Sequence, residues 1–85
     1  MTEATVVVLR LFAAARETAG RGRDEIEGGT VGDVMDAACR RYGAGFAAVL
    51  ATSRVWVNGE AAERADPLAP GDEVAVLPPV SGGSG

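Results

Sequence analysis

The fold of this 85-residue chain is decided by one stretch near its start, Thr5-Val6-Val7-Val8-Leu9-Arg10-Leu11-Phe12. β-Branched and large apolar residues favour a strand, because they pack well on a pleated surface. Successive side chains alternate, so the odd positions from Val7 to Leu11 share one face and the even positions from Val6 to Arg10 share the other. Apolar residues on both faces predict a central strand, covered on one face and partly covered on the other.

A second strand and one long helix are predicted to follow. After the break Gly20-Arg21-Gly22, the polar residues 23–27 form a short strand candidate that pairs with the first strand as a hairpin. Residues 30–42 form the clearest helix, because Thr30 is a good N-cap and Asp33 stands three residues on, as in a capping box. One apolar stripe at helical spacing consists of Val31, Val34, Met35, Ala38 and Tyr42. Residues 43–53 are expected to be a loop or a short helical turn.

The rest of the chain alternates short strands with turns. Residues 54–57 are a compact strand, Asn58-Gly59 is a strong signal for a tight hairpin, and residues 60–63 form the returning strand. Residues 66–72 are rich in turn formers, and residues 73–77 are the last strand. A hairpin, a helix and then more strands predict an α+β fold of the β-grasp, or ubiquitin-like, type. About five strands would pack on one main helix, with residues 1–77 as the domain and residues 78–85 as a flexible tail.

Composition excludes several classes of function. Eighty-five residues are too few for a large catalytic cleft with its own cofactor-binding domain. All eight basic residues are arginines, and twelve acids give a net charge of −4, so no basic patch for nucleic acid is expected. With no histidine and one cysteine, the chain cannot form a disulfide, a zinc site or a Ser-His or Cys-His pair by itself.

The sequence also predicts a cytoplasmic protein without a membrane segment. The first residues carry an acid and no basic region of the kind that begins a secretory signal. The longest apolar stretch without a charge, residues 43–53, is far too short to span a bilayer. The lone Cys39 suits a reducing compartment, and we interpret it as a partly buried structural thiol.

The tail offers two interpretations. Pro78 and Pro79 cannot continue a sheet ladder, because proline lacks the N–H donor. On composition alone, the residues beyond them would be an ordinary frayed terminus. The alternative is a narrow strip that enters the active site of another protein, since glycine lets a backbone approach catalytic groups closely. In that case the entering residues are Pro78, Pro79, Val80, Ser81 and Gly82.

Three segments then carry a family resemblance: residues 11–17 (LFAAARE), residues 57–59 (VNG) and residues 68–83 (LAPGDEVAVLPPVSGG). They resemble the MoaD/ThiS family of ubiquitin-like sulfur carriers, and most closely its MoaD branch, the small subunits of molybdopterin synthase. The resemblance covers nearly the whole domain. The last segment is specific, because it joins PGDEV, an apolar strand and PPVSGG.

The resemblance implies a mechanism in which other proteins supply the catalysis. An E1-like adenylyltransferase of the MoeB/ThiF type uses ATP and magnesium to adenylate a terminal glycine, and a persulfide donor converts it to a thiocarboxylate. The thiocarboxylate then delivers sulfur to a pterin precursor inside a MoaE-type large subunit. By position, Gly83 carries the acyl group and Gly82 is the thin residue beside it. The chain itself is expected to bind no cofactor or metal and to hold no catalytic side chain.

One feature departs from the family, whose members usually end at the diglycine. Ser84 and Gly85 follow here, and two extended residues displace the carboxylate by about 7 Å. We expect a processing protease to trim the chain to Gly83. The alternatives are that Gly85 is itself activated or that the extension is not native.

The resemblance also marks a partner-binding surface of Phe12, Ala61 and Leu77. Plain core packing is the alternative for Phe12 and Leu77, and Ala61 is small enough that its contribution is slight. For the remaining side chains we expect structural roles. Arg16 would hold its loop, Tyr42 and Trp56 would lie in the core or at its edge, and a solvated acidic face would consist of Asp24, Glu25 and Glu27.

Three alternatives to molybdopterin synthesis remain open. A carrier for another client (cysteine, thiamine or a specialised metabolite) would need removal of Ser84-Gly85. A ubiquitin-like protein modifier would attach through its C-terminus, although a chain without lysine could not form lysine-linked polymers of itself. A plain β-grasp interaction domain would do no acyl chemistry.

Overall fold

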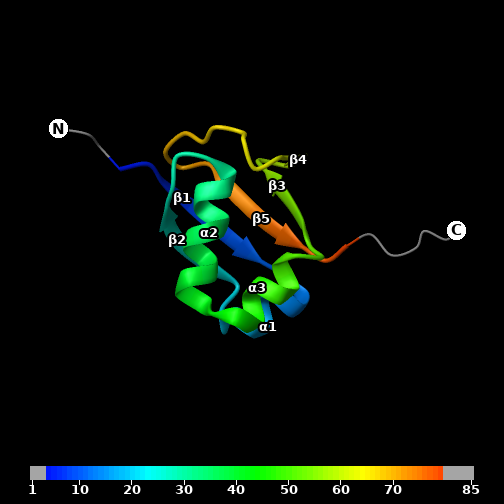
Figure 1. Ribbon diagram of the computed structural model, residues 1–85. Coiled ribbons are helices and arrows are strands. Elements are labelled where there is room, and N and C mark those ends of the chain that lie inside the picture. The colour runs from blue at the N-terminus through cyan, green and yellow to red at the C-terminus, as the bar shows by residue number, and fades with distance from the viewer. Residues whose placement is uncertain (1–3, 80–85) are drawn as a thin grey trace, which may run out of the picture.

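The computed structural model describes residues 4–79, in which helices cover one face of a twisted sheet (Figure 1). The elements in chain order are β1 (Val6–Leu11), α1 (Ala13–Ala19), β2 (Arg23–Glu27), α2 (Val31–Tyr42), α3 (Ala44–Leu50), β3 (Arg54–Val57), β4 (Glu60–Ala61) and β5 (Glu73–Leu77).

The sheet has the strand order β2-β1-β5-β3-β4. β5 pairs in parallel with β1, whereas the pairs β1–β2, β3–β5 and β3–β4 are antiparallel. The first and last apolar runs of the sequence therefore occupy inner positions, as predicted. This five-strand mixed sheet under one long helix confirms the predicted β-grasp arrangement.

The two faces of β1 behave as their residues predict. Val7 and Leu9 are fully buried under the helices, while Val6 on the opposite face is 42% exposed. The buried core joins this face of the sheet to the apolar stripe of α2 and to one residue each from α1 and α3. Its members are Val7, Leu9, Leu11, Ala15, Ile26, Val31, Val34, Met35, Ala38, Phe46, Val74 and Val76.

α2 begins and ends where the sequence predicts. The Thr30 hydroxyl accepts a hydrogen bond of 3.1 Å from the backbone N–H of Asp33, which satisfies one free donor of the first turn. Gly43 follows the last turn with φ 98°, a conformation that favours glycine, and its N–H donates to the Cys39 carbonyl.

Two short helices correct the sequence prediction. No helix was predicted at α1, and α3 is a seven-residue helix where a loop or one turn was expected. Both close one end of the core, because Ala15 of α1 and Phe46 of α3 are buried and α1 packs on α3. The Phe46 ring also meets the Tyr42 ring edge-on, with centroids 5.1 Å apart.

The β3–β4 hairpin is confirmed, although its second strand is shorter than predicted. Asn58 and Gly59 both have positive φ (50° and 87°), as a tight two-residue turn requires. β4 covers only Glu60 and Ala61, whereas the sequence predicted residues 60–63. After Ala61 the chain crosses over the start of α2, where Arg64 and Asp66 accept hydrogen bonds from Gly32 and Val31, before it reaches β5 (Figure 1).

Candidate partner-docking site at the root of the C-terminal tail

The central strand β5 leads directly into the tail. Its last residue, Leu77, pairs with Arg54 of β3 and is half-buried, and Pro78 and Pro79 beyond it are exposed. The described chain therefore leaves the sheet at its centre, at the end opposite to where it enters (Figure 1). The other predicted tail residues, Val80, Ser81, Gly82 and Gly83, together with Ser84 and Gly85, lie outside the described residues, and their roles stay predictions.

Phe12 lies beside Leu77 at this root of the tail. Its backbone N–H donates to the Val76 carbonyl at 3.2 Å, which holds the end of β1 against β5. The Phe12 side chain is 38% exposed, and the Arg10 guanidinium carbon lies 5.8 Å from the centre of its ring. This exposure removes plain core packing as the explanation for Phe12 and leaves its partner-binding role as a prediction.

A small apolar pocket of about 140 Å³ opens at the same place. It lies between the root of the tail, the start of α1 and the segment that follows α3. Its lining residues are Phe12, Ala13, Ala14, Ala15, Val49, Thr52, Ser53, Pro78 and Pro79. A partner that receives the tail can therefore contact apolar surface beside the two prolines.

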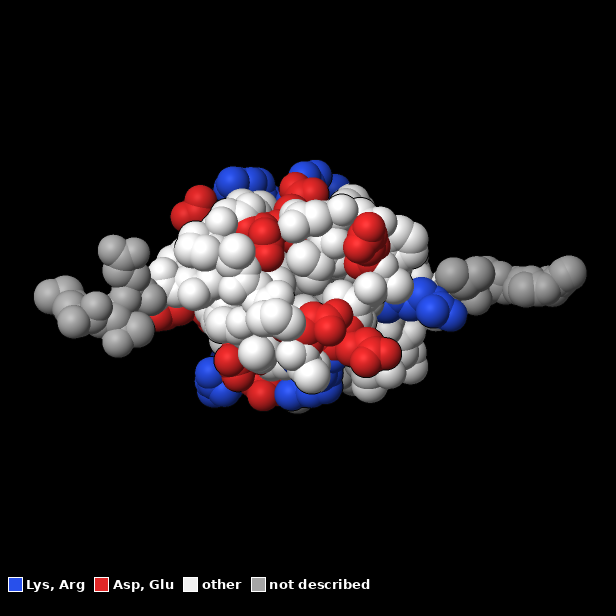
Figure 2. Space-filling model, turned by 90° about the horizontal axis from the view of Figure 1, so that it is seen from above, with Lys and Arg blue, Asp and Glu red and all other residues white. Residues whose placement is uncertain are grey.

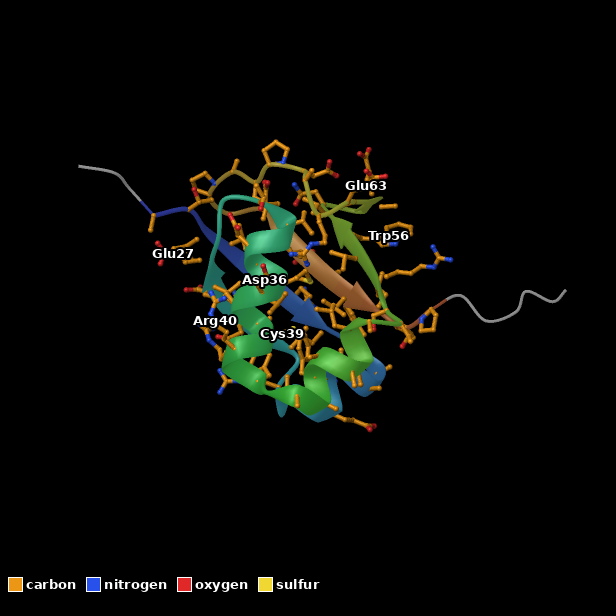
Figure 3. The ribbon with its side chains drawn as sticks, in the orientation of Figure 1. Glu27, Asp36, Cys39, Arg40, Trp56 and Glu63 are labelled. Atoms are coloured by element: carbon orange, nitrogen blue, oxygen red, sulfur yellow. The ribbon has the colours of Figure 1, made fainter. Side chains whose placement is uncertain are left out.

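Ala61, the third predicted surface residue, is exposed but lies apart from the other two. It pairs with Trp56 of β3, which in turn pairs with Ala75 of β5. Trp56 is 37% exposed on the uncovered face of the sheet (Figure 3), so its predicted place in or beside the core is wrong. Val55 and Val57 point to the core instead, since they pair with the buried Val76 and Val74.

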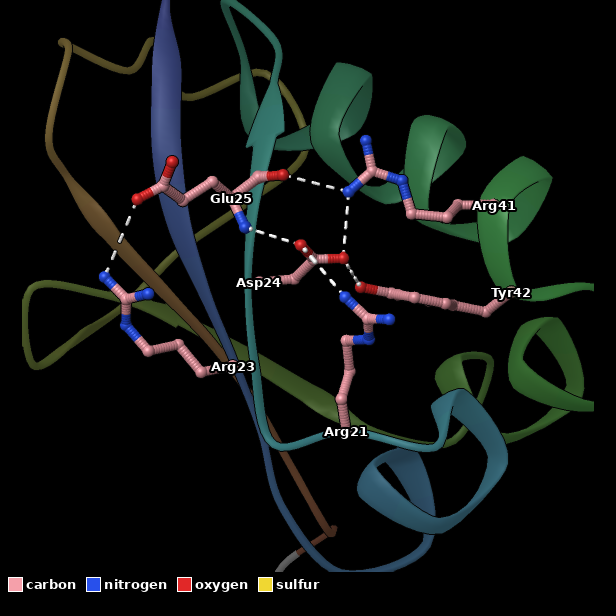
Figure 4. A network of polar contacts seen from close by, with 6 residues as sticks. All are labelled: Arg21, Arg23, Asp24, Glu25, Arg41 and Tyr42. Carbon is pink, nitrogen blue, oxygen red and sulfur yellow. Dashed lines mark hydrogen bonds and ion pairs between the residues drawn. The ribbon is translucent and has the colours of Figure 1, made fainter.

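The predicted solvated acidic face is also only partly correct. Glu25 and Glu27 are exposed, but the Asp24 side chain is only 15% exposed and accepts hydrogen bonds from Tyr42 and Arg41 (Figure 4). Hydrogen bonds from the Tyr42 hydroxyl, from Arg41 and from the Glu25 backbone N–H lower the pKa of Asp24 to about 2. Burial beside this carboxylate raises the pKa of Tyr42 to about 12. No local pattern in the sequence indicates this contact, because 17 and 18 residues separate its partners.

The described residues supply little chemistry of their own. Within residues 4–79, no three histidine, cysteine or acidic side chains lie close enough together to hold a metal ion. Cys39 is half-buried against the core, as predicted. Arg16 is exposed with its side chain beside Gly22, and its role in holding the loop stays a prediction. On the face in Figure 2, arginines form separate groups among acidic and uncharged residues. No helix in the described part of the chain has the length and apolar character needed to cross a membrane.

Fold and site together define a small ubiquitin-like domain that presents a C-terminal strip beside an exposed apolar surface. The model of the ThiS family matches residues 9–83, so the chain belongs to the ThiS family of ubiquitin-like sulfur carriers and modifiers.

Known relatives agree with this assignment. Small archaeal modifier protein 1 of Haloferax volcanii is 39% identical, and the match covers 87% of this chain and 97% of the relative. Its crystal structure has a TM-score of 0.75 to this one. A molybdopterin converting factor, subunit 1, from Pyrococcus furiosus has a TM-score of 0.81 and 30% identity, over 89% of this chain and 99% of that one. The BexX/CysO complex of Amycolatopsis orientalis contains a chain with a TM-score of 0.76 and 27% identity, over 91% of this chain and 99% of that one.

Proposed function

We propose that this chain is a cytoplasmic sulfur carrier whose Gly83 carboxylate is adenylated, converted to a thiocarboxylate and used as the small subunit of molybdopterin synthase. The observation that carries this proposal is the exit of the chain from the centre of the sheet through Pro78 and Pro79, beside the exposed Phe12. Similarity to a molybdopterin converting factor subunit supports the choice of client. The free, half-buried Cys39 is consistent with a reducing compartment.

The chemistry requires three contributions from partners. A MoeB/ThiF-type adenylyltransferase, with ATP and magnesium, joins the Gly83 carboxylate to AMP and releases pyrophosphate. The terminal sulfur of a cysteine persulfide then displaces AMP, and a second thiol cleaves the resulting acyl disulfide to leave the thiocarboxylate. A MoaE-type subunit finally uses that sulfur on a pterin precursor. The carrier contributes a terminus thin enough to enter each active site and a surface that docks beside it.

The position of the reactive carboxylate depends on Ser84 and Gly85. We propose that a protease removes these two residues, and the end of the family match at Gly83 supports this position. Intact-mass analysis of the protein recovered from its own cells tests the step. A chain that ends at Gly83 is expected, and recovery of the full-length chain alone, with sulfur on Gly85, would rule trimming out.

A protein modifier is the second candidate function. It is favoured by the 39% identity to small archaeal modifier protein 1 and shares the adenylation step with the carrier. The two functions differ in what attacks the activated glycine, because a modifier forms an amide with an amine of another protein. Delivery of sulfur to cysteine, thiamine or a specialised metabolite would keep the thiocarboxylate and change only the acceptor.

One reconstitution distinguishes these functions. The chain ending at Gly83, carrying a verified thiocarboxylate, is mixed with a MoaE-type subunit and a pterin precursor. The proposal expects stable association and transfer of sulfur to the pterin. Failure of transfer despite a verified thiocarboxylate would exclude the molybdopterin role. A ladder of high-mass conjugates in cells would then favour the modifier.

A further inference from the structure

β2 is the outer strand on one side of the sheet, so one of its edges has no strand partner. The Gly22 carbonyl accepts from the Leu11 N–H, and the Gly28 N–H donates to the Thr5 carbonyl. The even-numbered positions of β2 therefore direct their backbone groups to β1. Because the ladder has a period of two, Arg23, Glu25 and Glu27 direct theirs to the free edge.

The middle position of this free edge is already occupied by side chains. The Glu25 N–H donates to Asp24 Oδ1 at 2.8 Å, and the Glu25 carbonyl accepts from Arg41 Nη1 at 2.9 Å (Figure 4). Both backbone groups that an added strand would need at Glu25 are thus satisfied within the molecule.

The side chains that occupy the edge are themselves held in place. Asp24 Oδ2 accepts from Arg41 Nη1 at 2.9 Å and from the Tyr42 hydroxyl at 2.6 Å, and Arg21 lies 3.5 Å from Oδ1. Arg41 and Tyr42 come from the last turn of α2, so this Asp24 cluster (Asp24, Arg41 and Tyr42) ties the helix to the strand. The low pKa of Asp24 keeps its carboxylate ionised at neutral pH.

We propose that the Asp24 cluster keeps the free edge of β2 closed to strand pairing, and that the strand it excludes is β2 of a second copy of this chain. An unprotected edge is a template for another strand. Antiparallel pairing of two β2 strands about Glu25 would set Arg23 of each copy opposite Glu27 of the other. The opposite charges of Arg23 and Glu27 favour pairing with a second copy. Only the two Glu25 side chains, which would face each other, disfavour it.

Sedimentation of the Asp24→Ala/Arg41→Ala double variant tests this proposal. The unaltered chain is expected to stay monomeric, and the double variant to form dimers with an association constant at least about tenfold higher. Glu25→Thr in the double variant removes the like charges and should strengthen the dimer further. Glu25→Pro in the double variant removes the outward N–H of residue 25, which β1 does not use. This change should abolish the dimer.

The matched control is Asp36→Ala/Arg64→Ala. It removes an exposed ion pair, with 3.0 Å between Arg64 Nη2 and Asp36 Oδ1, that does not involve β2, and it should leave the chain monomeric. Amide hydrogen exchange shows whether the edge has opened in a folded molecule. At concentrations where the double variant is still monomeric, exchange at Glu25 should accelerate, while Ile26, which faces β1, stays protected.

Three results would overturn the proposal. They are a folded double variant that stays monomeric, a dimer that survives Glu25→Pro, and an unaltered chain that already pairs through β2. If the double variant does not fold, Asp24→Ala replaces it, since this change alone frees the Glu25 N–H and removes the carboxylate that holds Arg41. A folded Asp24→Ala variant without dimers would then be decisive against the proposal.

Discussion

The fold makes the carboxyl group of Asp24 markedly more acidic. Its pKa falls from 3.8 to about 2 in the folded protein, because the Tyr42 hydroxyl and Arg41 stabilise the carboxylate. A lowered folded-state pKa contributes stability that is fully present above pH 3.8, the unfolded value. This contribution is lost as the pH falls to about 2, and it amounts to roughly 2 kcal/mol.

The first prediction follows from this shift. The free energy of unfolding, measured with urea at a series of acidic pH values, should fall between pH 3.8 and about 2. Asp24→Asn should be less stable than the unaltered chain at neutral pH. Its free energy of unfolding should also decrease less between pH 3.8 and about 2. An equal dependence on pH in both proteins would show that Asp24 does not carry this stability.

Phe12 allows the docking surface to be tested without disturbing the core. Its side chain is 38% exposed, so Phe12→Ser should leave the thermal midpoint nearly unchanged while slowing partner-dependent adenylation at least about tenfold. The matched control is Val6→Ser, because Val6 is 42% exposed and begins β1, whereas Phe12 follows the other end of that strand. Equal rates of pyrophosphate release for the two variants would exclude Phe12 from the docking surface.

The connection between β2 and α2 depends on close packing at a glycine. A Cβ added at Gly28 would lie 2.7 Å from Val34 Cγ2 and 2.9 Å from the Val34 backbone nitrogen. At the neighbouring Gly29, the nearest such atom is Asp33 Oδ2 at 3.9 Å. The two glycines therefore differ in the space available to a side chain, and neither has the positive φ that would penalise alanine by itself.

This difference predicts that Gly28→Ala is destabilising by about 1–3 kcal/mol, because the start of α2 must shift away from β2. Gly29→Ala should change the free energy of unfolding by less than about 1 kcal/mol. Urea denaturation of both variants measures the two effects. Equal losses would mean that the connection adjusts more easily than its packing indicates.

The elements that sequence alone predicts are those whose signals are local. The strands Arg23–Glu27, Arg54–Val57 and Glu73–Leu77 have the predicted bounds, and α2 starts at its predicted cap. α1 and α3 were missed because seven residues form too short a helix to be stable without tertiary packing. Both helices are stabilised by tertiary packing, because Ala15 and Phe46 close the end of the core. Local sequence patterns do not show this packing.

The same limit applies to the candidate site. The end of the last strand before Pro78 could be predicted, since proline lacks the N–H that a sheet ladder needs. The partner-binding role of Phe12 stays a prediction. The direction of Trp56 could not, because it depends on how β3 pairs with β5. The burial of Asp24 could not either, since its partners Arg41 and Tyr42 reach it from the end of α2.

For the molecule as a whole, the absence of lysine has a chemical consequence. An activated Gly83 finds no ε-amine in its own chain to attack it. Six extended residues from Leu77 reach at most about 20 Å, and Arg54 pairs with Leu77 at the root of the tail. A bias towards arginine in a GC-rich genome explains the same composition without this protective role.

A lysine placed at that root tests the protective role. Incubation of an Arg54→Lys chain that ends at Gly83 with the adenylyltransferase and ATP should give a self-acylated product, seen as a loss of one water in the intact mass. Arg54→Gln, which removes the same guanidinium without adding an amine, should give none. An Arg54→Lys chain that is activated but never acylates itself would leave genome composition as the explanation.

The central claim is that the reactive group is the Gly83 carboxylate. It is tested most directly by the intact mass of two chains, one ending at Gly83 and one retaining Ser84-Gly85, after incubation with the adenylyltransferase, ATP, magnesium and a persulfide donor. One oxygen is expected to be replaced by sulfur at Gly83 of the shorter chain, and the longer chain is expected to stay unchanged. Sulfur on Gly85 of the longer chain, or none on the shorter one, would contradict it.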